Sequence, residues 1–97
     1  MIEHLVLMKF KEDTTQNQKD EIQSGLKGLK ELIPEIVDLS VGKNFCDRAQ
    51  GYELGLTVRF RDKQGLESYG SHPKHMAVVN DLIKPQVDAV IAVDYEF

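Results

Sequence analysis

Residues 52–61 read Tyr-Glu-Leu-Gly-Leu-Thr-Val-Arg-Phe-Arg and give the clearest structural signal in the chain. Every second position is apolar, and the positions between hold polar residues or glycine. Such alternation is typical of a β-strand with one buried face, because successive side chains of a strand point to opposite sides. We therefore expect a strand at 52–61 whose apolar side packs against a second layer.

The other elements follow from the same kind of pattern. Thr15 and Gln18 form a capping-box pair, and apolar residues at helical spacing follow them as far as Pro34. Pro73 divides a later helical region, because the residue before a proline is disfavoured in the α conformation. The expected elements are strands at 2–11, 36–43, 52–61 and 87–97, a helix at 15–33, and two shorter helical pieces at 63–70 and 73–85.

The resulting order is β-α-β-β-α-β, which predicts an α+β fold of the ferredoxin-like type. In this arrangement a four-stranded antiparallel sheet carries its helices on one face, and residues 1–97 are expected to form a single domain. The other face has no third layer to cover it, although we expect it to carry apolar side chains. These side chains are Leu5, Leu7, Ile91 and Val93. We therefore expect a homodimer in which two such faces meet.

Composition and charge exclude several classes of function. The formal net charge is -4, and the 12 Lys and Arg residues are scattered, so nucleic acid is not an expected partner. No apolar run approaches the roughly 18 residues of a membrane span. The single cysteine, Cys46, has no internal disulfide partner and falls in an expected loop at 44–51. We expect a cytoplasmic protein in which Cys46 takes no part in chemistry.

Residues 69–75, Tyr-Gly-Ser-His-Pro-Lys-His, carry two of the three histidines and one of the three tyrosines. His75 falls in the first turn of a helix, where the helix dipole disfavours the imidazolium, whereas a carboxylate such as Asp94 would favour it. We expect these two residues to form a hydrogen-bonded pair in which His75 is a general base. Tyr69 could then donate a hydrogen bond to a developing enolate.

Each of these residues also has a structural interpretation. His72 could cap the following helix, Tyr69 could be a core residue, and His4 could be a satisfied histidine on an apolar strand face. The spacing of His72 and His75 also fits two metal ligands, but a zinc site needs three or four. Pro73 moreover separates the two histidines from a common regular helix. We therefore expect no metal and no other cofactor.

Six short motifs occur in order along nearly the whole chain. They are His4-Leu5-Val6-Leu7-Met8-Lys9-Phe10-Lys11, Ile33-Pro34, Val41-Gly42-Lys43, Gly51-Tyr52, His72-Pro73-Lys74-His75 and Asp94-Tyr95. Together they resemble the Dabb family, the stress-responsive dimeric α/β-barrel domains. The resemblance implies a ferredoxin-like protomer and a homodimer whose two sheets form a barrel.

The family includes a plant polyketide cyclase that forms olivetolic acid by aldol condensation. The resemblance implies that His75 is the catalytic histidine, Tyr69 the catalytic tyrosine and Asp94 the carboxylate that supports the histidine. Leu54 stands where the cyclase has a further pocket histidine, so the identity of the substrate does not carry over. A pocket between sheet and helices is expected, and its ligand-binding residues are predicted to be His4, Val6, Leu54, Leu56, His72 and Ala92.

Three functions stay open at this point. The first is a cofactor-independent acid/base enzyme, of cyclase or related proton-transfer type, with His75 as its base. The second is a non-catalytic stress-response or ligand-binding dimer that uses the same pocket. The third is an oxygenase of the dimeric-barrel type, although no residue pattern indicates haem ligation. In each case the expected ligand is a small organic molecule of unknown identity.

Overall fold

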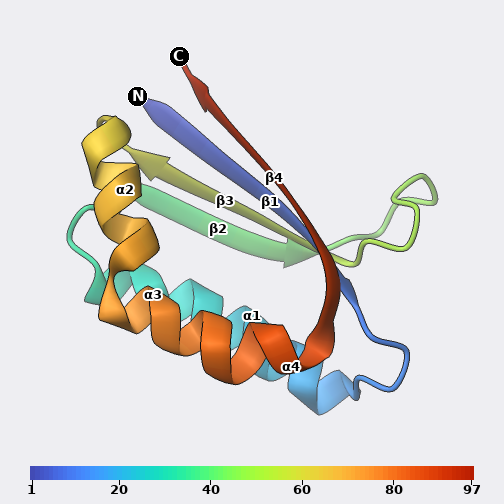
Figure 1. Cartoon of the computed structure of the whole chain (residues 1–97). Coiled ribbons are helices and arrows are strands. Elements are labelled where there is room, and N and C mark those ends of the chain that lie inside the picture. The colour runs from blue at the N-terminus through green and yellow to red at the C-terminus, as the bar shows by residue number, and fades with distance from the viewer.

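The chain folds into a four-stranded antiparallel sheet with all of its helices on one side (Figure 1). This computed structural model describes all residues, 1–97. The elements in chain order are β1 (Ile2–Phe10), α1 (Gln16–Leu32), β2 (Asp38–Lys43), β3 (Leu54–Phe60), α2 (Lys63–Ser71), α3 (Pro73–Val78), the π-helical turn η1 (Val79–Ile83), α4 (Lys84–Gln86) and β4 (Val87–Glu96). The predicted ferredoxin-like βαββαβ arrangement is confirmed.

The strands lie in the order β2-β3-β1-β4, so β1 is central and β2 and β4 are the edges. β1 pairs with β3 on one side and with β4 on the other, which places residues from both ends of the chain next to each other. His4 in β1, for example, lies directly opposite Val58 of β3 and Asp94 of β4. This register positions the candidate site.

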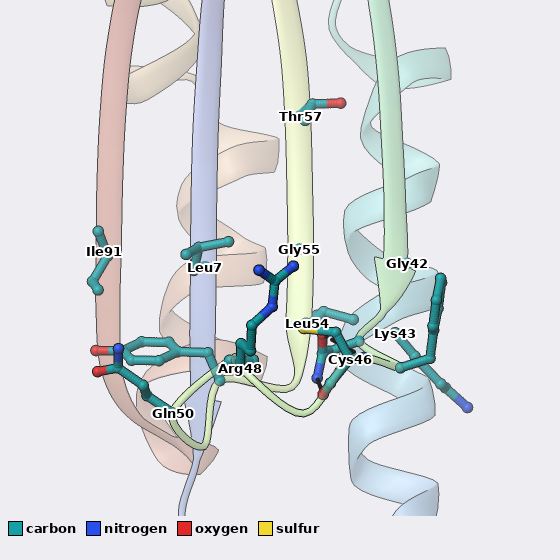
Figure 2. Close-up of a pocket in the computed structure, with 14 residues that line it drawn as sticks. Leu7, Gly42, Lys43, Cys46, Arg48, Gln50, Leu54, Gly55, Thr57 and Ile91 are labelled. Carbon is teal, nitrogen blue, oxygen red and sulfur yellow. Dashed lines mark hydrogen bonds between the residues drawn. The ribbon is translucent and has the colours of Figure 1, made fainter.

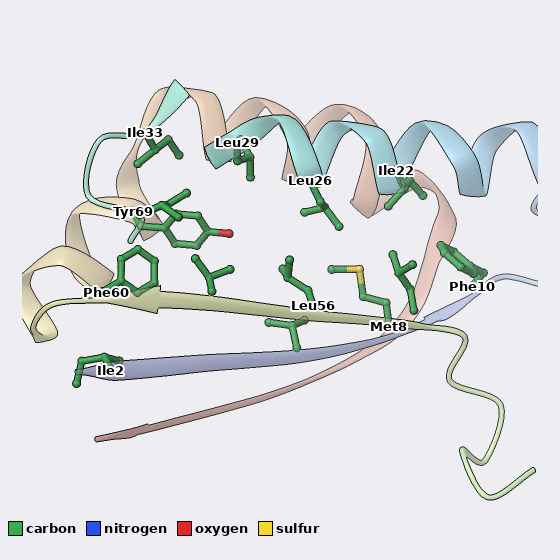
Figure 3. Close-up of a cluster of buried hydrophobic side chains, with 14 residues drawn as sticks. Ile2, Met8, Phe10, Ile22, Leu26, Leu29, Ile33, Leu56, Phe60 and Tyr69 are labelled. Carbon is green, nitrogen blue, oxygen red and sulfur yellow. The ribbon is translucent and has the colours of Figure 1, made fainter. Parts of the chain in front are cut away.

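The core fills the layer between the helices and the sheet (Figure 3). The predicted capping box is present, since the Thr15 hydroxyl accepts from the Gln18 N–H and the Gln18 side chain accepts from the Thr15 N–H. The alternating positions of β1 and β3 meet the apolar face of α1, as their periods predict. The core residues are Ile2, Val6, Met8, Phe10, Ile22, Leu26, Leu29, Ile33, Ile36, Leu54, Leu56, Val58, Phe60 and Tyr69.

The region 73–86 differs from the regular helix that was predicted to end at Pro85. The chain widens into the π-helical turn η1, and the Lys84 N–H donates to the carbonyl of Val79, five residues earlier. Pro85 then lies in the first turn of α4. Proline is tolerated there because its lack of an N–H does not remove a hydrogen bond that this turn would form. The helical segment therefore continues through Pro85 and ends at Gln86.

The side of the sheet turned away from the helices has no covering layer, and we call it the outer face. Leu7 and Ile91 are each 44% exposed there, although they lie opposite each other at the middle of the sheet. The outer-face residues of the four strands include Leu5, Leu7, Gly42, Gly55, Thr57, Ile91, Val93 and Tyr95. The chain has no helix long and apolar enough to span a membrane.

Candidate functional site

Three ring side chains from three elements meet where α2 and α3 pack on β1. Tyr69 of α2 lies with its ring centroid 4.3 Å from that of His75 in α3 and 5.9 Å from that of His4 in β1. The Phe60 ring supports Tyr69 from β3 at 5.1 Å. Tyr69 is only 2% exposed, whereas the two histidines are half-buried. We call His4, Tyr69 and His75 the site cluster.

His75 is oriented by the backbone of the preceding helix. Its Nδ1–H donates to the carbonyl of Gly70 at 3.1 Å, because the break at Pro73 turns α3 so that the imidazole reaches back to the end of α2. A carbonyl oxygen only accepts, so the proton lies on Nδ1 and the lone pair on Nε2. The imidazole is therefore fixed in a tautomer whose Nε2 can take up a proton.

Burial lowers the pKa of His75 below its ordinary value of 6.5. The hydrogen bond to Gly70 acts in the opposite direction, and the imidazoles of His4 and His72 lower the pKa of His75 further. Desolvation is the largest of these effects, since the charged form would lose hydration in this half-buried place. The neutral base is consequently favoured near neutral pH.

The predicted pair between His75 and Asp94 is wrong, because Asp94 binds a different histidine. The Nδ1–H of His4 donates to the Oδ1 atom of Asp94. The two residues are direct cross-strand partners in β1 and β4, whereas His75 satisfies its own Nδ1 with a backbone carbonyl. The sequence contained this signal, since the ends of two adjacent antiparallel strands must lie side by side.

His72 has a structural role in the protein. It is the N-cap of α3, and its Nδ1 accepts the backbone N–H of Lys74 at 3.1 Å. The Nδ1 atoms of His72 and His75 thus each form a hydrogen bond with a backbone group. No group of three or more His, Cys, Asp or Glu side chains is placed to hold a metal ion. The expected contact between His72 and a ligand stays a prediction.

The hydroxyl of Tyr69 points into the layer between α1 and the sheet (Figure 3). Burial raises the pKa of Tyr69 to about 12, so the phenol keeps its proton at any physiological pH. The hydroxyl forms no hydrogen bond within the protein, and it is not fully buried, because a Glu35 carboxylate oxygen is the only fully buried side-chain oxygen or nitrogen without a partner. It is a neutral donor that the fold itself does not use.

The other predicted ligand-binding residues lie in two different environments. Val6 and Leu56 are buried in the core, whereas Ala92 is exposed on the side of β4 that faces the helices. Ala92, with its neighbours Val90 and Asp94, forms an open strip along this edge strand. The strip leads to His4, because Asp94 accepts a hydrogen bond from His4.

The four main cavities of the protein do not reach the site cluster. The largest of them, about 600 Å³, lies on the outer face beneath the loop that joins β2 to β3 (Figure 2). Leu54 contributes to its wall, but His4, Tyr69 and His75 do not. The sequence did not predict this hollow, because a loop without periodicity gives no indication of how it folds over a sheet.

We expect the charge state of His75 to contribute to the pH dependence of stability. Because burial lowers the pKa of His75 below 6.5, the unfolded chain binds a proton there while the folded chain does not. The stability that neutral His75 provides is complete above pH 6.5 and is lost as the pH falls toward the pKa of the folded state. Denaturant unfolding at about pH 7.5 and about pH 5.5 should show a larger loss for wild type than for His75→Gln.

The imidazole resonances of the three histidines, followed by NMR during a pH titration, would give each pKa separately. This control is needed because the chain has two further histidines, His4 and His72. A pKa for His75 at or above 6.5 would contradict the expectation.

Comparison with known proteins identifies relatives over the whole chain. The model of the family described as Stress responsive A/B Barrel Domain (Dabb) matches residues 2–97. A stress-response A/B barrel domain-containing protein of Arabidopsis thaliana is 33% identical over 92 residues, which is 94% of this chain but 35% of the plant protein. The chain thus spans about a third of the length of this relative.

Two further relatives match over nearly their full lengths. Olivetolic acid cyclase of Cannabis sativa is 27% identical over 96 residues, covering 97% of this chain and 94% of the cyclase. A crystal structure of a dimeric ferredoxin-like protein of unknown function from Jannaschia sp. is similar, with a TM-score of 0.80 and 26% identity. That match covers 99% of this chain and 98% of the other.

Proposed function

Because the chain belongs to the Dabb family of stress-responsive A/B barrel domains, we propose that it binds a small carbonyl compound at the site cluster and moves a proton on it. In this proposal His75 is the base, Tyr69 is the hydrogen-bond donor and the pair of His4 and Asp94 borders the site. The reaction needs no cofactor.

The observation that carries the proposal is the unused hydroxyl of Tyr69. The hydroxyl is not fully buried, since an oxygen of Glu35 is the only fully buried side-chain oxygen or nitrogen without a partner, so it still borders space that water can enter. The hydroxyl is neutral, since burial raises the pKa of Tyr69 to about 12, and it belongs to a ring in contact with His75. A neutral donor that the protein itself does not use, beside an oriented base, favours a role in ligand recognition over packing alone.

The chemistry proposed is abstraction of a proton from the carbon next to a carbonyl. Nε2 of His75 takes the proton, the electron pair of the broken C–H bond moves into the carbonyl group, and an enolate forms. The hydroxyl of Tyr69 donates to the enolate oxygen and stabilises its negative charge. The enolate carbon can then attack a second carbonyl of the same molecule, whose electron pair moves onto its oxygen, and that oxygen takes the proton from His75, which closes the ring by aldol addition and regenerates the base.

The surroundings favour a ligand that is apolar apart from its carbonyl groups. The cluster lies against the apolar core, and the strip on β4 that leads to it contains the exposed side chains of Val90 and Ala92. The hydrogen-bonded pair of His4 and Asp94 includes no Lys or Arg side chain and no second carboxylate. An uncharged ketone chain lying on this strip would place its carbonyl near His75.

The proposal is tested by hydrogen–deuterium exchange at the carbon next to a ketone. Linear methyl ketones, such as 2-heptanone, exchange these protons slowly by themselves in D₂O, so catalysis is measured by NMR as loss of the proton signal. Wild type should accelerate the exchange, His75→Gln should reduce the acceleration by a factor of at least about 100, and Asp94→Asn should reduce it less. Lys74→Gln is the matched control, because Lys74 is an exposed neighbour of His75 outside the cluster.

A second candidate is binding without catalysis, and one observation favours it. None of the four main cavities reaches the cluster, so a ligand on the open strip of β4 would stay in contact with water, which weakens the electrostatic effects that catalysis needs. Under this alternative a ketone should raise the melting temperature of wild type, and exchange should be equally slow in wild type and in His75→Gln. That result would overturn the catalytic proposal and leave the binding site.

The proposal includes pairing of two copies through their outer faces. Leu7, Ile91 and Val93 form an exposed apolar row across β1 and β4, and a row of this kind usually marks a contact with another protein. The Jannaschia relative is described as dimeric, which supports pairing of two copies without saying which faces meet. In a pair of this kind the two sheets would form a barrel around the joined apolar faces.

A further inference from the structure

The floor of the hollow on the outer face includes two glycines among its strand residues (Figure 2). Gly42 of β2 and Gly55 of β3 lie directly opposite each other in the sheet, and Leu7 of β1 lies beside Gly55. A Cβ atom placed on either glycine would meet no other atom within 4 Å. Glycine weakens a strand interior because it has no side chain to pack, so two facing glycines indicate a close approach by something outside the protomer.

One rim of the hollow is the loop at 44–53, which the protomer holds in a fixed shape. The Asn44 side chain donates to the Cys46 carbonyl at 2.9 Å and accepts the Cys46 N–H at 3.2 Å. At the other end of the loop, the Glu53 N–H donates to the Met8 carbonyl at 2.9 Å, and the Glu53 carboxylate pairs with Lys19 of α1. The loop is therefore tied to both the sheet and the helix layer.

This fixed loop presents a fully exposed aromatic side chain, Phe45. A solvent-exposed phenylalanine contributes no burial of apolar surface to the stability of the protomer. Aromatic side chains on preorganised loops often serve as anchors of protein–protein interfaces. The apolar row of Leu7, Ile91 and Val93 continues the surface of the hollow across the sheet. Leu7 and Ile91 line the hollow itself, whereas Val93 lies beyond it and would be covered by a second copy of the chain but not by a small molecule in the hollow.

We propose that the hollow over Gly42 and Gly55 is a socket for a second copy of this chain, and that Phe45 is the side chain each copy inserts into its partner's socket. One Phe45 and one socket on each protomer make the contact self-complementary, which a two-fold symmetric pair requires. The inference rests on the pairing through the outer faces that forms part of the proposed function.

The Gly55→Val variant distinguishes an effect on the contact between two copies from an effect on the folding of the protomer. Within one protomer a Cβ atom at residue 55 meets no other atom within 4 Å, and a β-branched side chain favours a strand. The fold of the separated protomer should therefore be as stable as wild type or more stable, as measured by denaturant unfolding at concentrations below both dissociation constants. The dimer dissociation constant should nevertheless rise by a factor of at least about 10, since the socket is filled.

The matched control is Gly28→Ala in α1, where an added Cβ also meets no atom within 4 Å. This change should stabilise the helix without altering the dissociation constant, because α1 lies on the opposite side of the sheet from the outer face. Analytical ultracentrifugation over a dilution series measures all of these dissociation constants.

A second variant, Phe45→Ala, tests the inserted side chain. It should raise the dissociation constant by a factor of at least about 10, and its effect should not add to that of Gly55→Val, because both changes remove the same contact. Fully additive effects would overturn the placement of Phe45 in the socket. A dimeric wild type with an unchanged constant in Gly55→Val would overturn the socket, whereas a monomeric wild type would overturn the underlying pairing as well. Ketone exchange reports separately on the site cluster.

Discussion

A Leu7→Glu variant should be monomeric at micromolar concentrations at which we expect the wild-type protein to be a dimer. Leu7 lies at the middle of the central strand β1, opposite Gly55 on one side and Ile91 on the other, and it is 44% exposed on the outer face. Pairing of two outer faces would bury the new carboxylate in an apolar contact without a cation beside it. We expect the dimer dissociation constant to rise at least about 100-fold, measured by light scattering over a dilution series.

The matched control is Leu32→Glu, which makes the same chemical change at an exposed leucine of α1. That residue lies in the helix layer, so the dissociation constant should stay within about twofold of wild type. Circular dichroism should show both variants folded. A Leu7→Glu protein that stays dimeric, or a Leu32→Glu protein that dissociates equally, would place the contact elsewhere on the molecule.

The fold was predictable because its signals are local. The alternation at residues 52–61, the capping box at Thr15 and the break at Pro73 each depend on a few neighbouring residues, and each reappears in the structure. The π-helical turn at Val79–Ile83 was not predictable in this way. It shifts the hydrogen-bond pattern without changing the apolar spacing that the sequence displays.

The sequence predicted that four of the candidate residues lie close together, but not which hydrogen bonds they form. His4, Tyr69, His75 and Asp94 do lie in one region, but the hydrogen bonds follow from register and backbone position. Asp94 meets His4 because the two strands pair at those residues, and His75 meets the Gly70 carbonyl, a group that every residue carries. Side-chain types therefore identify candidates, whereas only the fold determines their partners.

Two substitutions at Tyr69 separate the structural role of its ring from the functional role that we propose for its hydroxyl. Tyr69→Ala should destabilise the protein by about 3–5 kcal/mol, since it leaves a cavity where a fully buried ring packed against Phe60 and His75. That is a large share of a typical total stability of about 5–15 kcal/mol. Tyr69→Phe keeps the ring and removes only the hydroxyl, so its unfolding free energy should equal or exceed that of wild type.

The same Tyr69→Phe variant should lose function while it gains or keeps stability. With no donor for the enolate oxygen, the catalysed exchange of ketone protons should fall by a factor of at least about 10. Phe60→Ala is the contrasting control, because Phe60 is a core ring without a polar group and its loss should lower stability in the manner of Tyr69→Ala. If Tyr69→Phe instead lowered the unfolding free energy by more than about 1.5 kcal/mol, the hydroxyl would have a structural partner, and the role we propose for it would be wrong.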